Sequence, residues 1–214
     1  MIIESFRNRF IQMKNNGNNV QYVLDIGAYR GDFTETVKSV WPTAIVRQFE
    51  ADERQKPWLQ DNAIIALLGD QDNQSVNYYT LPNDKITTGS SIFKEQTIHY
   101  ASPIVIQKEM KTLDSLHTTY NFFGDWRNLG LVKLDTQGSE LLILEGARQF
   151  LHKKQPRYIL IECSWQQYNQ GSPLLAEVVL QLDKLDYKAN DIFDTSYDLH
   201  NNLLQTDILF ERTQ

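Results

Sequence analysis

The sequence of 214 residues predicts one α/β domain with a mostly parallel sheet. Apolar segments of strand length alternate with amphipathic segments of helix length along most of the chain, which is the pattern of repeated βα units. Five of the apolar segments end in an acidic residue, at Asp25, Glu50, Asp70, Asp135 and Glu162. The length suits a single well-buried core, and nothing in the composition requires a second domain. We therefore expect residues 1–214 to form one domain.

Composition and charge narrow the possible functions. The content of 41% hydrophobic and 22% charged residues is typical of a soluble protein, and no apolar run approaches the roughly 20 residues that span a bilayer. The net charge is −6 and no Lys/Arg cluster offers a surface for DNA or RNA, so a small or neutral partner fits better. A single cysteine, Cys163, excludes an internal disulfide, and the opening MIIESFRNRFIQMK lacks a signal-peptide pattern. Both features predict a cytoplasmic location.

The first segments predict a helix followed by a βα unit. Residues 2–14 carry apolar side chains near helical spacing, and NNGNN then ends that helix, so residues 1–20 form an N-terminal helix and linker. A strand is expected at 21–26, and a short helix follows the next turn until Trp41-Pro42 stops it. A second strand is expected at 44–50.

The turn after the first strand has the features of a nucleotide-binding turn. In YVLDIGAYRGD, Asp25 lies two residues before Gly27, and Gly31 stands at the start of the helix. Glycines allow a ligand to approach the backbone, and helix-start amides point at it. Glu50 follows Asp25 by 25 residues, close to the roughly 20-residue offset of the acid that binds ribose hydroxyls in nucleotide folds. On position alone, Asp25 could instead cap the turn.

The middle of the chain predicts a change of pattern. A helix is expected at 52–62 and a strand at 63–70, which ends in Gly69 and Asp70. A small strand at 75–82 precedes a long aperiodic segment at 82–103, and a segment of this length inside a compact domain is typical of a lid or binding loop. Residues 104–116 then read as a strand that leads into a capped turn.

The second half returns to alternating strands and helices. Strands are expected at 129–135 and 157–163, with a helix at 139–151 between them. A helix at 173–185, a segment YKANDIF and a last strand at 203–211 complete the chain, and the last strand is expected to pair as an antiparallel edge.

Several stretches in this order resemble the FkbM-type S-adenosylmethionine-dependent methyltransferases. The stretches are VLDIGAYRG, FEAD, ALLGD, GSSIF, LVKLDTQGSELLILEGA, YILIECSWQQYNQGSP and TDILF. The fifth is the most specific. The sequence departs from the family at Tyr29, where asparagine is more usual, at FEAD, where Phe-Glu-Pro is more common, and at Gln137, which replaces a glutamate of one branch.

The resemblance implies the Rossmann-like class I methyltransferase fold, a mostly parallel seven-stranded sheet with helices on both faces and an antiparallel C-terminal edge strand. It also implies S-adenosylmethionine as the cofactor. Its amino-acid and ribose portions would lie at the glycine turn, its ribose hydroxyls at Glu50, and its adenine beside Asp70. The cofactor-binding residues implied are Asp25, Gly27, Ala28, Tyr29, Gly31, Glu50, Ala51, Gly69, Asp70, Ser91 and Asp135.

Three residues are candidates for the chemistry of methyl transfer, an in-line displacement in which the acceptor loses a proton. Asp135 and Glu162 close predicted parallel strands, at whose carboxyl ends ligands gather in open α/β sheets. His99, in the predicted lid, has an ordinary pKa near neutrality. Asp135 could equally serve the turn and helix start that follow it, and a loop histidine is usually solvated. These three residues lack the local spacing of metal ligands, so no obligatory metal is predicted.

The sequence thus predicts an O-methyltransferase that acts on a hydroxyl of a sugar or glycan precursor or of a secondary metabolite, with no nucleic-acid partner and no membrane span. No oligomeric state follows from it. One alternative is a short-chain nicotinamide-dependent oxidoreductase, but its G-x-G-x-x-G turn and Tyr-x-x-x-Lys pair are missing at the right places. A second is a non-catalytic cofactor-binding module of the same fold, against which Asp25, Gly27, Gly31, Glu50 and Asp135 argue.

Overall fold

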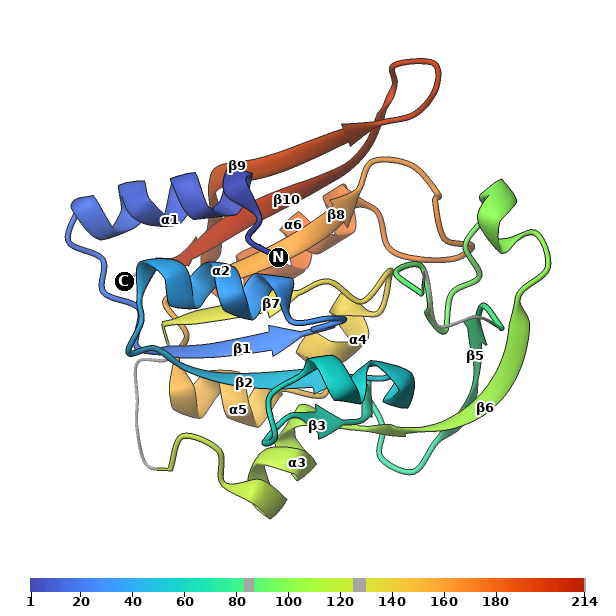
Figure 1. The fold of residues 1–214 in the computed structure, drawn as a ribbon, viewed down its shortest axis with the longest axis horizontal. Coiled ribbons are helices and arrows are strands. Elements are labelled where there is room, and N and C mark those ends of the chain that lie inside the picture. The colour runs from blue at the N-terminus through green and yellow to red at the C-terminus, as the bar shows by residue number, and fades with distance from the viewer. Residues whose placement is uncertain (83–86, 125–129, 214) are drawn as a thin grey trace.

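A seven-stranded sheet forms the centre of the molecule in the computed structural model, which describes residues 1–82, 87–124 and 130–213 (Figure 1). The strands lie in the order β3-β2-β1-β7-β8-β10-β9. Their bounds are Ile64–Ile65 for β3, Ile45–Glu50 for β2, Tyr22–Ile26 for β1, Leu131–Leu134 for β7, Tyr158–Ser164 for β8, Leu203–Arg212 for β10 and Tyr187–Tyr197 for β9.

The strands from β3 to β8 are parallel, as predicted, and β10 is antiparallel to both of its neighbours. The antiparallel last strand is confirmed, but the edge of the sheet is β9 and not the last strand. The reason is local, because residues 198–202 join β9 to β10 as a hairpin, and β10 then enters the sheet between β8 and β9. The segment YKANDIF, to which no element was assigned from the sequence, forms the first part of β9.

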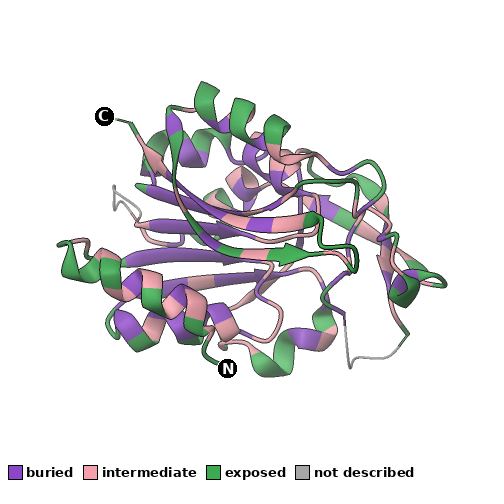
Figure 2. Cartoon of the chain, turned by 90° about the horizontal axis from the view of Figure 1, so that it is seen from above, coloured by how far each residue is buried: buried purple, intermediate pink, exposed green. Residues whose placement is uncertain are grey.

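Helices cover both faces of this sheet. α1 (Glu4–Asn15) and α2 (Asp32–Val40) lie on one face, and α3 to α6 lie on the other. The bounds of the second group are Leu113–Tyr120 for α3, Glu140–Glu145 for α4, Arg148–Lys154 for α5 and Leu175–Lys184 for α6. Figure 2 shows the central strands mostly buried between the two helical layers, whose outward faces are exposed. None of the helices in the described ranges is long and apolar enough to cross a membrane.

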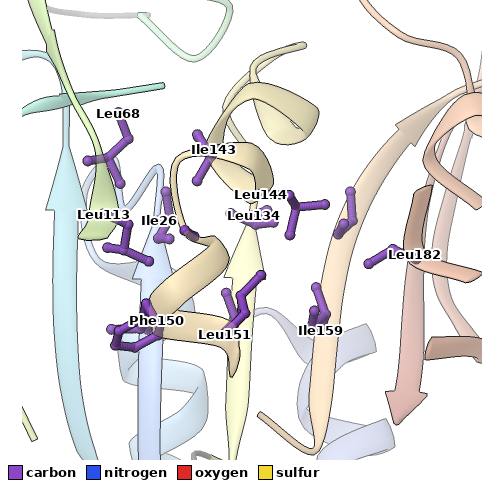
Figure 3. Packing of buried hydrophobic residues seen from close by; sticks show 14 of the residues in the cluster. Ile26, Leu68, Leu113, Leu134, Ile143, Leu144, Phe150, Leu151, Ile159 and Leu182 are labelled. Carbon is purple, nitrogen blue, oxygen red and sulfur yellow. The ribbon is translucent and has the colours of Figure 1, made fainter. Parts of the chain in front are cut away.

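Successive side chains of the central strands alternate between two hydrophobic cores, one on each face of the sheet. Val23 packs with α1 and α2, whereas Leu24 packs on the opposite face, because successive side chains of a strand point to opposite sides. Figure 3 shows Ile143 of α4 in the second core, next to Ile26 at the end of β1. The central strands are therefore mostly apolar on both faces, as is typical of parallel strands between helices, with Asp25, Gln48 and Lys133 as buried polar exceptions.

The strand predicted at 63–70 is divided between two sheets. Its first part is β3, and its second part is β4 (Leu67–Leu68), which pairs with β6 (Ile104–Lys111). A second sheet of three strands thus forms from β4, β6 and β5 (Ser75–Thr80). The division falls at Ala66, whose amide donates to the Glu50 carbonyl (2.8 Å) before the chain turns away.

Two predicted helices are shorter than expected. The segment at 52–62 contains only a 3-10 helix, η1 (Glu53–Trp58), with Pro57 inside it. The helix predicted at 139–151 is two helices, α4 and α5, because the Asp114 carboxylate accepts the amides of Gln149 and Phe150 and so caps a new helix start. Gly146 lies at the break.

Candidate active site

A cavity of about 380 Å³ opens at the carboxyl ends of β1, β2, β7 and β8. The chain runs outward from β1 to β3 on one side and from β7 to β9 on the other, so the strand order reverses between β1 and β7. Ligands of open α/β sheets bind at such a reversal. The residues argued below are among those that line the cavity: Gly27, Ala28, Tyr29, Glu50, Ala51, Ser91, Lys133, Asp135, Gln137, Glu162, Asp194 and Asp207.

The glycine turn after β1 is held by its neighbours on both sides. The amides of Gly27 and Ala28 both donate to the Phe49 carbonyl (3.0 Å each), which fixes the turn to β2. Gly27 has a φ of +76°, and a Cβ atom there would lie 1.8 Å from the Asp135 carbonyl oxygen. No residue other than glycine fits this position, because both the φ and the space exclude a side chain.

Glu50 shapes the wall of the cavity at the end of β2. Its Oε2 accepts the Tyr29 amide (2.8 Å) and its Oε1 accepts the Asp52 amide (2.8 Å). Burial raises the pKa of this carboxyl, and the two amides oppose that shift. A carboxylate accepts about four hydrogen bonds, so Glu50 retains capacity for ligand hydroxyls. Tyr29, with a φ of +47°, serves the site through its backbone amide as well as by lining the cavity.

Asp25 lies beneath the turn and does not line the cavity. The side chain is fully buried, and its Oδ2 accepts the Thr34 hydroxyl (2.7 Å). Its Oδ1 lies 3.6 Å from Lys133 Nζ. Burial raises the pKa of Asp25, and the Lys133 charge opposes that shift. The residue therefore supports the turn from inside, and its side chain does not line the cavity.

Lys133 is a buried cation that the sequence reasoning missed. From the middle of β7, its Nζ donates to the Gly27 carbonyl (2.7 Å) and lies 3.2 Å from Asp135 Oδ2. Burial lowers the pKa of Lys133, but the carboxylates of Asp135 and Asp25 outweigh burial, and the net pKa is raised. A lysine inside the apolar run LVKL was the available signal, because a buried lysine requires partners of opposite charge.

Gln137 connects the two carboxylates that end β7 and β8. Its Nε2 donates to Asp135 Oδ1 (3.2 Å) and to Glu162 Oε2 (2.7 Å). Gln205 from β10 donates a second amide to the same Glu162 oxygen (2.9 Å). Burial, followed by the charge of Asp135, raises the pKa of Glu162 well above its ordinary value. Glu140 fixes the turn that carries Gln137 by accepting the Thr136 amide (2.8 Å).

The part of the predicted lid from Thr87 to Ser91 reaches the cavity. Thr87, Thr88, Ser90 and Ser91 line the cavity, and Ser91 Oγ donates to the Gln137 carbonyl (2.9 Å). Residues 83–86 of the predicted lid lie outside the described residues. His99 is placed differently, because it is exposed in the short helix η2 (Ile98–Tyr100) and does not line the cavity.

Two further acids, Asp207 and Asp194, line the cavity and were absent from the sequence prediction. Asp207 lies opposite Glu162 in the β10–β8 pairing and opposite Asp194 in the β10–β9 pairing. Burial, followed by the charge of Asp135, raises the pKa of Asp207 to about 7. An aspartate within the apolar run TDILF was the sequence signal.

The structure thus brings together most, but not all, of the predicted site residues. Eight line the cavity: Gly27, Ala28, Tyr29, Glu50, Ala51, Ser91, Asp135 and Glu162. Five do not: Asp25, Gly31, Gly69, Asp70 and His99. Gly31 is the N-cap of α2 with a φ of +82°, and the Gly69 carbonyl packs against Gly146, so both glycines have backbone roles. Within the described ranges, no group of three or more His, Cys, Asp or Glu residues is arranged to hold a metal ion.

The seven-stranded sheet with helices on both faces has the Rossmann-like fold of class I methyltransferases. The FkbM methyltransferase domain matches residues 25–189, which is most of the sequence. The chain therefore belongs to the FkbM family of S-adenosylmethionine-dependent methyltransferases. No curated protein matches the sequence significantly.

Three solved structures show the same fold at low identity. An FkbM methyltransferase from Methylobacillus flagellatus KT is 16% identical with a TM-score of 0.52, and the match covers 89% of this chain and 43% of that one. This chain therefore spans less than half of the length of that relative. Magnesium protoporphyrin IX methyltransferase from Synechocystis PCC 6803 with bound S-adenosylmethionine is 10% identical with a TM-score of 0.52, covering 98% and 81% of the two chains. M. capricolum TrmK in complex with S-adenosylhomocysteine is 12% identical with a TM-score of 0.51, covering 100% and 70%.

Proposed function

We propose that this chain is an O-methyltransferase that transfers the methyl group of S-adenosylmethionine to a hydroxyl of a small acceptor, either a sugar or glycan precursor or a secondary metabolite. One observation carries the proposal. A single cavity joins the glycine turn and Glu50 at one end to the carboxylates of Asp135 and Glu162 at the other. The first pair suits a nucleoside, and the second pair suits an acceptor that must lose a proton.

The residues at the β1–β2 end fit the cofactor. Glu50 has both oxygens oriented by backbone amides and remaining capacity for ribose hydroxyls. Gly27 leaves the backbone open where any side chain would collide. Asp25, which the resemblance placed in contact with the cofactor, instead holds Lys133 and Thr34 beneath the turn. The cofactor supplies an electrophilic methyl group, and these residues position it.

Asp135 is the base in this proposal, and Glu162 orients the acceptor. Asp135 lines the cavity, and Lys133 and Gln137 fix its two oxygens separately. Burial and the charge of Asp135 raise the pKa of Glu162 well above its ordinary value. Its Oε2 accepts the side-chain amides of Gln137 and Gln205, and its Oε1 remains for the acceptor. His99, the third candidate, is exposed outside the cavity and has no part in the reaction.

Calorimetry with S-adenosylmethionine, followed by turnover of a methylated acceptor, tests the proposal. We expect Asp135→Asn to lower kcat by about 100-fold, which is the usual contribution of a general base, and to change donor affinity much less. Asp72→Asn is a control, because Asp72 is exposed in the turn between β4 and β5, where it accepts hydrogen bonds from the start of α3, and lies outside the cavity. Absence of donor binding at millimolar concentration would refute the function, and binding of NADH instead would favour an oxidoreductase.

Three related features belong to the same proposal. Residues 1–214 act as one domain, and the segment up to residue 103 that begins in the cavity wall closes over the ligands as a lid. Cys163 is buried and free, which suits a reducing compartment such as the cytoplasm. The acidic cavity disfavours a nucleic-acid acceptor, because a phosphate backbone would be repelled there.

A further inference from the structure

We propose that the end of the cavity bounded by Glu162, Asp207 and Asp194 binds a protonated amine of the acceptor. This carboxylate row, as we call these three residues, would select acceptors that carry an ammonium group, such as amino sugars, over neutral or anionic ones. The inference rests on the proposed function, since it names the class of acceptor for the same cavity.

The sheet places the three carboxylates side by side. Asp207 of β10 is paired with Glu162 of β8 on one side and with Asp194 of β9 on the other. Directly opposed residues of antiparallel strands project from the same face, with Cβ atoms about 4.5–5.5 Å apart. All three side chains line the cavity. The row is therefore a continuous acidic strip across three strands.

Asp207, at the centre of the row, has no hydrogen-bond or ion-pair partner among the described residues, although it is mostly buried. Its neighbours in the row differ, because Glu162 accepts two side-chain amides and Asp194 accepts the Ser5 hydroxyl (3.1 Å). Burial and the charge of Asp135 raise the pKa of Asp207 to about 7. A mostly buried carboxylate that faces a cavity without a partner is an open hydrogen-bond acceptor.

The charges around the row call for a cation. Like charges directly opposite each other destabilise a sheet, so the row carries a cost in the unliganded protein. Among the cavity-lining residues that the structure describes, Lys133 is the one cation. It is already engaged with Asp25, Asp135 and the Gly27 carbonyl. A bound ammonium group would offset the repulsion within the row.

Asp207 and Asp194 lie farther along the sheet from the glycine turn than the proposed base does. Neighbouring strands are about 4.8 Å apart, so Glu50 on β2 and Asp135 after β7 are separated by two strand spacings, or about 10 Å. Asp194 on β9 lies three further spacings away, or about 14 Å from Asp135. The row is on the far side of the proposed base from Glu50, where the acceptor must lie.

An ammonium group fits the row better than a metal ion does. A divalent metal needs several ligands that converge on one point, and the described part of the chain holds no such group. An ammonium has three separate N–H donors, which a strip of carboxylates can accept one by one. The carboxylates also disfavour phosphorylated acceptors by repulsion.

The test compares three sugars that differ at one substituent: glucosamine, N-acetylglucosamine and glucose. Their binding to protein saturated with S-adenosylhomocysteine is measured by saturation-transfer NMR at pH 7.5. We expect glucosamine to bind at least tenfold more tightly than the other two. We expect Asp207→Asn with Asp194→Asn to remove that preference and to leave S-adenosylhomocysteine affinity within twofold. Asp61→Asn, an exposed change outside the cavity, controls for the overall negative charge.

Each result decides the proposal. Equal binding of the three sugars overturns it, and so does a preference for glucosamine that survives in the double variant or disappears in Asp61→Asn. A parallel loss of S-adenosylhomocysteine affinity would assign the row to the cofactor and also overturn it. Failure of S-adenosylhomocysteine to bind the unmodified protein is a different outcome, which contradicts the methyltransferase function itself. Thermal unfolding of each variant shows whether it is folded, and Asp194→Asn alone serves if the double variant is not.

Discussion

The two ends of the cavity differ in how completely their polar groups are paired. At the β1–β2 end, both oxygens of Glu50 accept backbone amides, and the turn amides of Gly27 and Ala28 are bound to the Phe49 carbonyl. At the β8–β10–β9 end, Asp207 has no partner among the described residues. The polar groups of the first end are held in place by hydrogen bonds within the protein. The second end contains a carboxylate that no cation in the described part of the chain neutralises. The proposed donor end is therefore recognised by its geometry, and the proposed acceptor end by a carboxylate without a partner in the described ranges.

The largest effect is expected from Gly27→Ala, which disrupts the glycine turn at the β1–β2 end of the cavity. The added Cβ would lie 1.8 Å from a backbone oxygen at a φ of +76°. Neither the collision nor the strain can relax without moving β7, so we expect a loss of about 3–5 kcal/mol in the free energy of unfolding. Chemical denaturation measures it. Gly17→Ala is the control, because its φ is +87° but nothing lies within 4 Å, and strain alone costs about 1–2 kcal/mol. Equal losses in the two variants would contradict the close approach.

Glu50→Ala comes next and tests whether the β1–β2 end of the cavity binds the donor. It removes a charged acceptor of ribose hydroxyls, so we expect S-adenosylhomocysteine affinity to fall by about 10- to 100-fold, or about 1.5–3 kcal/mol. Calorimetry measures the loss. The amides of Tyr29 and Asp52 also lose their partner, so the melting temperature falls as well. Glu53→Ala, which removes an exposed acid from the next turn, controls for charge. Unchanged affinity in Glu50→Ala refutes the assignment.

Asp207→Asn tests the β8–β10–β9 end of the cavity through the pH dependence of the free energy of unfolding. The ordinary pKa of 3.8 applies to the unfolded chain, and the folded pKa is about 7, so folding binds a proton between these values. Below about pH 4 both states are protonated and Asp207 costs nothing. As the pH rises from about 4 to about 7, ionised Asp207 increasingly lowers the free energy of unfolding, and this loss is complete above about pH 7. We therefore expect Asp207→Asn to stabilise the protein by about 1–2 kcal/mol at pH 8 and not at pH 4.

The stability curve of this variant is measured by thermal unfolding between pH 4 and pH 8. About 1–2 kcal/mol corresponds to a gain of roughly 2–8 °C in Tm for a chain of this size. Asp198→Asn is the contrasting control, because hydrogen bonds from the Asn202 side chain and amide lower the pKa of Asp198 to about 2. A gain that is constant across the pH range would show that Asp207 does not carry the charge penalty.

The smallest effect is expected from His99→Ala, because His99 lies outside both ends of the cavity. The residue is exposed and does not line the cavity. We expect kcat and KM to change by less than about twofold, with the same pH–rate profile as the unmodified enzyme. Steady-state kinetics across pH 6–9 measure this. Disappearance of a pKa near neutrality from the profile would return His99 to the chemistry and weaken the assignment of Asp135.

The fold and the donor end could be read from local patterns. A strand, a glycine turn and a helix start are consecutive in sequence, so the stretch from Tyr22 to Asp32 specifies its own conformation. The acids at the ends of β1, β2, β7 and β8 follow from strand boundaries in the same way. The limits of this reasoning appear at the helix predicted for 139–151, where Asp114 from a distant segment caps a new start and breaks the helix. They also appear at Asp25, whose position at a strand end did not reveal that it faces Thr34 and Lys133.

By itself, the sequence determined the βα alternation, the turn at Gly27, the place of Glu50 and the family. Only the tertiary structure showed which acidic side chains lie next to one another along the cavity. Asp207 faces Glu162 because an antiparallel register joins β10 to β8, and Asp194 joins them through the hairpin with β9. Register depends on pairing between strands that are far apart along the chain, and a shift of one residue would turn every side chain to the other face. Local periodicity specifies a strand but not its register, so the proposed acceptor end could be recognised only in the folded chain.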